Sequence, residues 1–152
     1  MSEAEQPVFN IEKIYLKDSS LEVPNSPQVF LQGGQPQFEV HLHTDGKRVN
    51  ETLFEVFIKV TLTGKVEDKV LFLVEVSQAG IFQIRNVPED EINPVLGIAC
   101  PTILFPYARE TIADLVGRAG FPPIHLAPVN FEALYAARTK KQDDGPKIEI
   151  AH

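Results

Sequence analysis

Few side chains in this sequence could carry covalent chemistry. Cys100 is the only thiol, which excludes an internal disulfide, and a nucleophilic cysteine needs a base that lowers its pKa. The histidine nearest to it along the chain, His125, lies in a segment bracketed by prolines, with nothing to orient its ring. We therefore expect Cys100 to be buried and inert.

Metal and cofactor chemistry finds little support in the motifs. His41 and His43 share one strand face, but zinc needs at least three protein ligands, and no HExxH motif or carboxylate cluster supplies a third. The phosphate-binding patterns GxGxxG and GxxxxGK are missing, as is the GxSxG nucleophile motif. The sequence predicts no metal, no cofactor and no enzymatic activity.

A row of acidic side chains is more informative. Asp18, Ser20 and Glu22 alternate in one predicted strand, so they point to the same side and the two carboxylates lie about 13 Å apart. Leu73 and Glu75 share a face in another predicted strand. A flat acidic face beside an apolar residue suits docking of a basic protein, although an ordinary solvated face would show the same pattern.

The composition is that of one globular domain. The chain has 152 residues, of which 43% are hydrophobic and 23% charged, so it can bury a core. Lysine and arginine number 14 against 21 aspartates and glutamates, a net charge of −7, which disfavours nucleic acid as a partner. An acidic N-terminus and the lack of a bilayer-length apolar run predict a cytosolic protein that is not inserted in a membrane.

Hydrophobic periodicity predicts strands first and helices last. The phase of the first strand slips near Glu12, where a β-bulge fits, and a long proline-bounded loop at 24–36 follows this strand. The first helix tolerates Pro106 only near its first turn and should stop at Gly120, and Asn130 is a good N-cap for the second. The predicted elements are strands over 9–21, 38–43, 54–62 and 70–76, a turn at 63–65, and helices over 108–119 and 131–135.

This order of elements predicts an α+β fold with an antiparallel sheet. We expect a flexible N-terminus over 1–8, one domain over 9–138 and a flexible polar tail over 139–152. The sheet face opposite the core carries Phe57, Leu71 and Leu73. Since two short helices cover only one face, the other needs a partner subunit or a ligand, unless these are single exposed apolar residues.

Four ordered blocks of the sequence resemble SecB, the bacterial protein-export chaperone family. They cover its first strand, its hairpin, the entry of its first helix, and the crossing into its second helix. Together they span roughly residues 9–135, which makes the resemblance far more specific than any short motif. The blocks are IYLKDSSLEVPNSP at 14–27, EVSQAGIF at 75–82, CPTILFPYARE at 100–110 and FPPIHLAPVNFEALY at 121–135.

The resemblance implies a four-stranded antiparallel sheet with two C-terminal helices on one side, assembled as a homotetramer that is a dimer of dimers. The hairpin positions to which the tetramer is sensitive in the family fall on Val74, Val76 and Gln78. These have the opposite parity to Leu73 and Glu75. The hairpin would therefore offer assembly on one face and partner docking on the other.

The resemblance also implies an ATP-independent chaperone that holds unfolded preproteins in a translocation-competent state and delivers them to the SecA ATPase. The residues that match the family's SecA-docking positions are Asp18, Glu22, Leu73 and Glu75. A groove lined by apolar and aromatic side chains would bind unfolded segments without reading their sequence. The candidates for this groove are Phe30, Leu31, Phe131, Leu134 and Tyr135, with core packing as the alternative for the helical ones.

Two departures from the family pattern stand out. The family usually carries a tryptophan in the first long loop, where this chain has Gly34 and no tryptophan anywhere. The tail also differs from the longer acidic tails that contact SecA in the family, so we do not expect this contact here. Other interpretations left open are a SecB-like chaperone dedicated to one antitoxin, an enzyme that uses Cys100, and a purely structural assembly protein.

Overall fold

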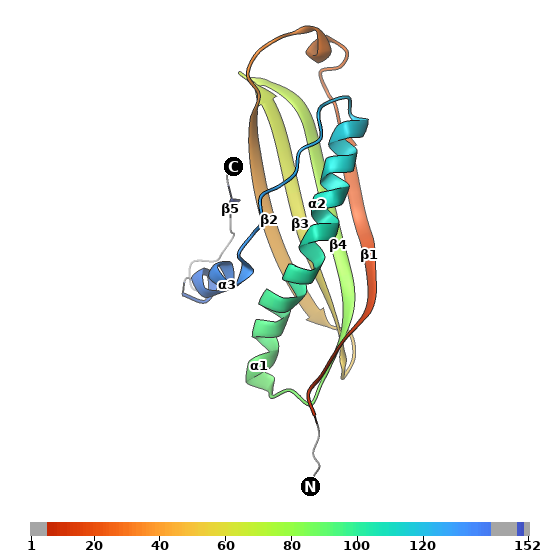
Figure 1. Cartoon of the computed structure of the whole chain (residues 1–152), viewed down its shortest axis with the longest axis vertical. Helices are drawn as coiled ribbons and strands as arrows, with labels where there is room; N and C mark the ends of the chain where they lie inside the picture. The colour runs from red at the N-terminus through yellow and green to blue at the C-terminus, as the bar shows by residue number, and fades with distance from the viewer. Residues whose placement is uncertain (1–5, 141–148, 151–152) are drawn as a thin grey trace.

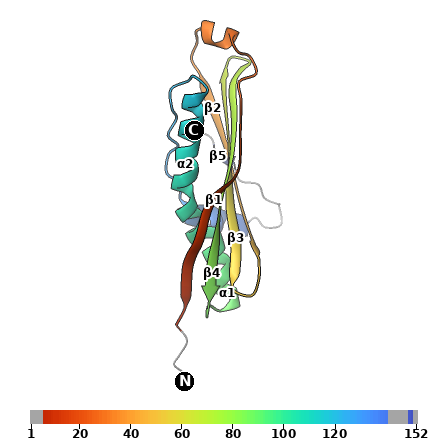
Figure 2. The same cartoon turned by 90° about the vertical axis from the view of Figure 1, so that its right-hand side faces the viewer.

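The computed structural model describes residues 6–140 and 149–150, and its main feature is a long antiparallel sheet (Figure 1). The strands lie in the order β1-β4-β3-β2-β5, and Figure 2 shows α2 packed along one side of the sheet. The four long strands and the helical C-terminal region confirm the predicted α+β architecture. The elements are β1 (Val8–Glu22), η1 (Gln28–Leu31), β2 (Gln37–Arg48), β3 (Leu53–Val66), β4 (Lys69–Arg85), α1 (Glu89–Pro94), η2 (Val95–Ala99), α2 (Cys100–Arg118), α3 (Phe131–Lys140) and β5 (Glu149–Ile150).

The core lies between α2 and the covered face of the sheet. One side of α2 repeats an apolar residue every four positions, and β3 contributes every second residue, which are the periods of a helix and a strand. The side chains on these two surfaces are fully buried. Burial of each leucine, isoleucine or valine among them adds about 1.5–3 kcal/mol to the free energy of unfolding. The buried set is Leu104, Ala108, Ile112 and Val116 on α2, and Val56, Ile58, Val60 and Leu62 on β3.

The turn predicted at 63–65 is wrong, because β3 continues through it to Val66. Gly64 lies inside the strand, where a Cβ atom would stand 2.8 Å from the ring of Phe72 and 3.3 Å from the ring of Phe38. The glycine therefore makes room for two aromatic rings instead of reversing the chain. The reversal comes at Glu67, whose φ of 55° is left-handed.

The predicted start of the first helix is also wrong. α1, η2 and α2 follow one another without a break from Glu89 to Arg118, so Pro106 lies well inside the helical path. η2 is a π-helical segment, and the N–H of Cys100 donates to the carbonyl of Val95, five residues earlier. Pro101, which has no N–H to donate, follows directly after this wider turn, where the regular bonding of the α-helix is already interrupted. The predicted stop is confirmed at Gly120, whose φ is 96°.

Bulges change which side chains reach the open face, meaning the face of the sheet opposite α2. The slip predicted near Glu12 is confirmed as a register shift between Ile11 and Lys13. A second shift falls between Leu16 and Asp18. A third, opposite Gly64 and Lys65, leaves Leu71 as the extra residue, and Leu71 joins the core at 7% exposure. The prediction that Leu71 lies on the open face is therefore wrong.

The second predicted helix is confirmed as α3, and the Asn130 side chain caps it by accepting the N–H of Ala133 at 3.0 Å. α3 extends to Lys140, so the domain boundary expected at 138 falls within the helix. The short strand β5 pairs with β2. The rest of the expected tail, and residues 1–5 of the expected N-terminal segment, lie outside the described residues.

The contact that holds α3 against η2 gives a first prediction. Gly97 faces the ring of Tyr135 so closely that a Cβ atom would stand 2.5 Å from Cδ1. We expect Gly97→Ala to lower the free energy of unfolding by about 1–3 kcal/mol, because overpacking must displace the ring. Chemical denaturation measures the change.

The control is the same substitution in a Tyr135→Ala chain, where the obstacle is gone. There, alanine should be neutral or stabilising by up to about 1 kcal/mol, as helix propensity alone dictates. Equal destabilisation in both chains would show that the Tyr135 contact does not hold α3 in place.

Candidate functional site

The structure brings Asp18, Glu22, Leu73 and Glu75 together on the open face, and we call these four residues the acidic surface. β1 and β4 are neighbours, with Ser20 opposite Glu75 and Glu22 opposite Leu73. Because paired residues point to the same side of a sheet, the carboxylates of both strands flank the leucine. The shared side predicted from the sequence for Asp18, Ser20 and Glu22 agrees with this register.

The charges on the acidic surface are not equally free. Lys59 Nζ lies 3.4 Å from the Glu75 carboxylate, and the Thr61 hydroxyl donates to it at 3.5 Å. The Glu75 side chain is still 39% exposed. Asp18 and Glu22 are both exposed, and within residues 6–140 and 149–150 neither forms an ion pair. Three carboxylates against one ammonium leave this surface negative.

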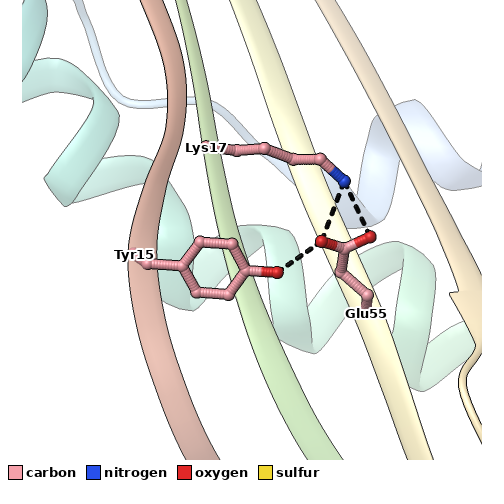
Figure 3. A network of polar contacts seen from close by, with 3 residues as sticks. All are labelled: Tyr15, Lys17 and Glu55. Carbon is pink, nitrogen blue, oxygen red and sulfur yellow. Dashed lines mark hydrogen bonds and ion pairs between the residues drawn. The ribbon is translucent and has the colours of Figure 1, made fainter.

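A partly buried polar network of three side chains lies on the same face of the sheet (Figure 3). Tyr15 and Lys17 reach from β1 across β4 to Glu55 on β3. The Tyr15 hydroxyl donates to Glu55, and Lys17 Nζ lies 2.9 Å from both carboxylate oxygens. The Tyr15 bond and the Lys17 charge hold the pKa of Glu55 below its usual range, against the effect of burial. Sequence reasoning missed this network, because its members are 38 to 40 residues apart.

Tyr15 provides a spectroscopic prediction. Burial, and then the bond to the Glu55 carboxylate, raise the pKa of Tyr15 from 10.0 to about 12. A raised pKa means that Tyr15 stabilises the fold below its unfolded pKa, and that this contribution is lost as the pH rises from about 10 to 12. In an ultraviolet titration, we expect one of the 3 tyrosines to ionise late and near the loss of the fold.

Because the chain has no tryptophan, only the tyrosines contribute to this absorbance change. Tyr15→Phe should remove the late ionisation and leave the other two unchanged. If no tyrosine of the native chain ionises late, the Tyr15–Glu55 bond does not exist in solution.

Two of the five groove candidates, Phe30 and Leu31, lie on η1 at one end of the sheet, where aromatic rings pack together. Phe30 on η1 stacks on Phe121 at 5.1 Å between ring centroids, and Phe121 meets Phe72 at 5.3 Å. Phe38 continues the series, 6.1 Å from Phe72. We call these four rings the aromatic end. Phe30 is 47% exposed and its neighbour Leu31 is 84% exposed, so this end presents apolar surface to solvent.

The other three candidates lie on α3, away from η1 (Figure 1). Phe131 is a core residue at 4% exposure, with its ring edge-on to Phe105 at 5.9 Å. Leu134 and Tyr135 are half-buried and line a small hollow against β2. An adjoining cavity of about 470 Å³ includes Tyr135, Arg138 and Leu96. The five candidates therefore belong to two separate places, and burial favours the core alternative for Phe131.

Sequence reasoning missed the remaining rings of the aromatic end. Phe121 follows Gly120 in a proline-rich crossing, and a Cβ atom on Gly120 would stand 3.0 Å from the Phe30 ring. A glycine beside an aromatic residue in a long loop is the one signal that could have suggested a close approach. Nothing local indicated which ring it would meet.

Val74, Val76 and Gln78 lie on the covered side of β4. Val74 and Val76 are at 1% and 0% exposure in the core under α2. Gln78 is at 4%, and its amide donates to the Tyr15 carbonyl at 3.1 Å. These residues can influence an interface only by supporting the elements that form it. Exposed apolar side chains nearby are Ile11 and Leu16 on β1 and Tyr107 on α2, at 47–49% exposure.

The residues considered for covalent or metal chemistry are placed as follows. Cys100 is fully buried, and burial raises the pKa of its thiol to about 12, which makes the thiolate inaccessible near neutral pH. His41 Nε2 lies 3.2 Å from a Glu39 oxygen, and His43 packs edge-on against Phe57. Across the described part of the chain, no three histidine, cysteine or acidic side chains come together as metal ligands.

The arrangement is that of a binding protein: a helix-backed sheet whose open face carries the acidic surface and whose one end exposes the aromatic side chain of Phe30. The model of the family described as Preprotein translocase subunit SecB matches residues 2–142. The chain belongs to the SecB family, which is a family of protein-export chaperones.

Two relatives agree with this assignment, and one solved structure has a similar fold. The protein-export protein SecB of Chromobacterium violaceum is 58% identical over 137 residues, covering 90% of this chain and 91% of the relative. That of Dechloromonas aromatica is 55% identical over 146 residues, covering 96% of each. A SecB-like chaperone of Mycobacterium tuberculosis, solved in complex with an antitoxin peptide, has a TM-score of 0.67 at 20% identity, covering 80% of this chain and 90% of that one. The last shows the fold alone.

No helix among the residues that the structure describes has both the length and the apolar character needed to cross a membrane.

Proposed function

We propose that this protein is an ATP-independent holdase of the bacterial cytoplasm, without enzymatic activity, which binds unfolded preproteins and delivers them to SecA. The observation that carries the proposal is the aromatic end, where Phe30 and Leu31 are exposed over a base of stacked rings. An unfolded chain presents apolar side chains that a folded protein hides. Rigid rings can bury such side chains without requiring a particular sequence, because apolar burial is non-directional.

Weak sites of this kind become effective when they are multiplied. A client that crosses several subunits gains avidity, because each further contact is intramolecular. Binding only the unfolded state draws the client away from folding by mass action, so no nucleotide is required. The half-buried Leu134 and Tyr135 would offer a second, shallower contact near α3.

Delivery to SecA is assigned to the acidic surface. The carboxylates of Asp18 and Glu22, which form no ion pair with any described residue, would attract a basic partner surface, and Leu73 would supply the apolar contact between the two strands. Client binding and docking would then use opposite faces of the sheet, since Phe72 points to the α2 side and Leu73 to the open face. A bound client therefore need not leave before SecA docks.

A homotetramer built as a dimer of dimers is part of the proposal. Support comes from the exposed Ile11, Leu16 and Tyr107, which form apolar surface on β1 and α2. The outer edge of β1 also has no strand partner among the described residues, and a bare edge is suited to pairing with a second copy. Val74 and Val76 would affect assembly from beneath, by supporting α2.

The test is the refolding of a chemically denatured secretory precursor, diluted with and without this protein in the absence of nucleotide. We expect refolding to be arrested near one client per tetramer and to resume on release. Unchanged refolding and aggregation would overturn the general holdase function.

A second candidate is a chaperone dedicated to one antitoxin. It is favoured only by the Mycobacterium tuberculosis structure, whose SecB-like chain holds an antitoxin peptide. That function would predict capture of one peptide and no arrest of unrelated precursors. The acidic surface would then have no role in delivery, so a SecA titration separates the two candidates.

A further inference from the structure

We propose that Glu55 is a positioning residue of the acidic surface: together with Tyr15 it holds the Lys17 ammonium away from Asp18 and so keeps that surface negative for a basic partner. This inference rests on the proposed docking of SecA. It assigns a role to a network that lies outside the four docking residues.

The register shows the direction in which Lys17 is held. Lys17 is the extra residue of the bulge between Leu16 and Asp18, level with Ser77 and Gln78 of β4. Glu55 lies opposite Ile81, further toward the end of β4 that is remote from Glu75. The Lys17 side chain therefore runs along the open face away from Glu22 and Glu75.

The contact is strong enough to fix a flexible side chain. Lys17 Nζ meets both oxygens of Glu55 at 2.9 Å, and the Glu55 side chain is only 11% exposed against 42% for Lys17. Tyr15 fixes the carboxylate from the other side. Ala79 of β4, paired with Tyr15, is fully buried beneath this contact. Its small side chain lets residues of β1 and β3 meet over the strand between them.

Release of Lys17 would change the charge of the acidic surface. The surface has three carboxylates and the single ammonium of Lys59. Lys17 precedes Asp18 directly, so a freed ammonium could pair with that carboxylate and add a second positive charge. A basic partner would then meet a surface with one uncompensated negative charge instead of two. Attraction between oppositely charged surfaces sets the association rate, so the partner would bind more slowly and more weakly.

The alternative is that the network only fastens β1 to the sheet, or that Glu55 acts through net charge alone. A double-mutant cycle separates these from the proposal. SecA affinity is measured for Glu55→Gln with Lys17 present and with Lys17→Gln. Asp45→Asn serves as the matched control, since Asp45 is a carboxylate on the same face that lines a hollow with Lys17 but makes no bond to it.

We expect Glu55→Gln to weaken binding three- to tenfold with Lys17 present and less than twofold in the Lys17→Gln background. Asp45→Asn should weaken SecA binding by the same small factor in both backgrounds. Equal factors for Glu55→Gln in both backgrounds, or no weakening at all, would overturn the inference. Should Glu55→Gln fail to fold, Glu55→Asp carries the same cycle, with weakening confined to the Lys17 background. Glu75→Lys is measured alongside: if it too leaves SecA affinity unchanged, the docking proposal itself has failed.

Discussion

Reversing Glu75 to lysine is expected to weaken SecA binding by tenfold or more while leaving client binding intact. The substitution replaces a carboxylate at the centre of the acidic surface by an ammonium beside Lys59, whose Nζ lies 3.4 Å from the present carboxylate. Two positive charges then stand next to Leu73. Charge complementarity across a docking interface is worth about 1.5 kcal/mol or more for close pairs, which corresponds to the tenfold change. A titration of SecA with each variant measures it.

The matched control is Glu51→Lys, which makes the same change of charge in the loop between β2 and β3. Glu51 is exposed and only its backbone carbonyl is used, as the acceptor for Arg48. The loop lies at the end of β3 remote from Thr61, the residue opposite Glu75. Equal losses for the two variants would mean that net charge alone matters. An unchanged affinity for Glu75→Lys would remove the acidic surface from the docking site.

Replacing Phe30 by alanine is expected to reduce client affinity about tenfold, near 1.4 kcal/mol, because an aromatic anchor of a binding site is lost. The ring is 47% exposed and stacked on Phe121, so it can contact a client while being held in place. The fold should lose about 2 kcal/mol, since the aromatic pair and the burial of about half of the ring are both lost. The refolding assay of a denatured precursor reports the loss as a higher chaperone concentration needed for arrest.

Phe9→Ala is the matched control for Phe30→Ala. Phe9 is 40% exposed and also stacks on one ring, that of Phe82, but it lies near the start of β1, far from η1. Because Phe9 lies on the strand proposed for assembly, the assembled tetramer of this variant is used, and it should arrest refolding as the native tetramer does. If Phe9→Ala weakens arrest as much as Phe30→Ala, clients bind exposed rings in general and the aromatic end is no special site.

Much of the sheet could be predicted from the sequence because alternation is a local signal. The strands over 38–43, 54–62 and 70–76 all fall within observed strands, and the bulge at Glu12 shows as a break in phase. Local signals failed where long-range packing decides. Gly64 looks like a turn residue until the rings of Phe72 and Phe38 are placed over it.

The helices show a similar limit. Three prolines between Glu89 and Arg118 argue against one helical path on propensity alone. The path nevertheless continues, with a π-helical segment between Pro94 and Pro101, where the regular bonding is interrupted. The spacing of Ala108, Ile112 and Val116 was a sound guide to the buried side of the helix. It could not show where the helix began.

The candidate site also has one part that local patterns predict and another that they do not. Strand parity places Asp18 with Glu22 and Leu73 with Glu75, but only the pairing of β1 with β4 brings the two sets to one face. The bonds of Lys17 and Tyr15 to Glu55 cross an intervening strand, and the stacking of Phe30 on Phe121 joins two loops. Such contacts depend on the order of strands and the path of loops, which no local pattern encodes.

The two bulges of β1 also determine how this strand can change in length. Side chains alternate between the two faces of a strand. One residue added or lost therefore moves every side chain beyond it to the opposite face of the sheet. Loss of Ser19 could be absorbed by drawing Lys17 into the ladder, which would place Asp18 opposite Val76, on the α2 side of the sheet, and so remove its carboxylate from the acidic surface. Loss of Glu12 or Lys17, which have no partner on β4, leaves the direction of every other side chain unchanged. Insertions and deletions accepted by evolution in β1 should therefore gather at these two positions, while the stretch between Asp18 and Glu22 keeps its length.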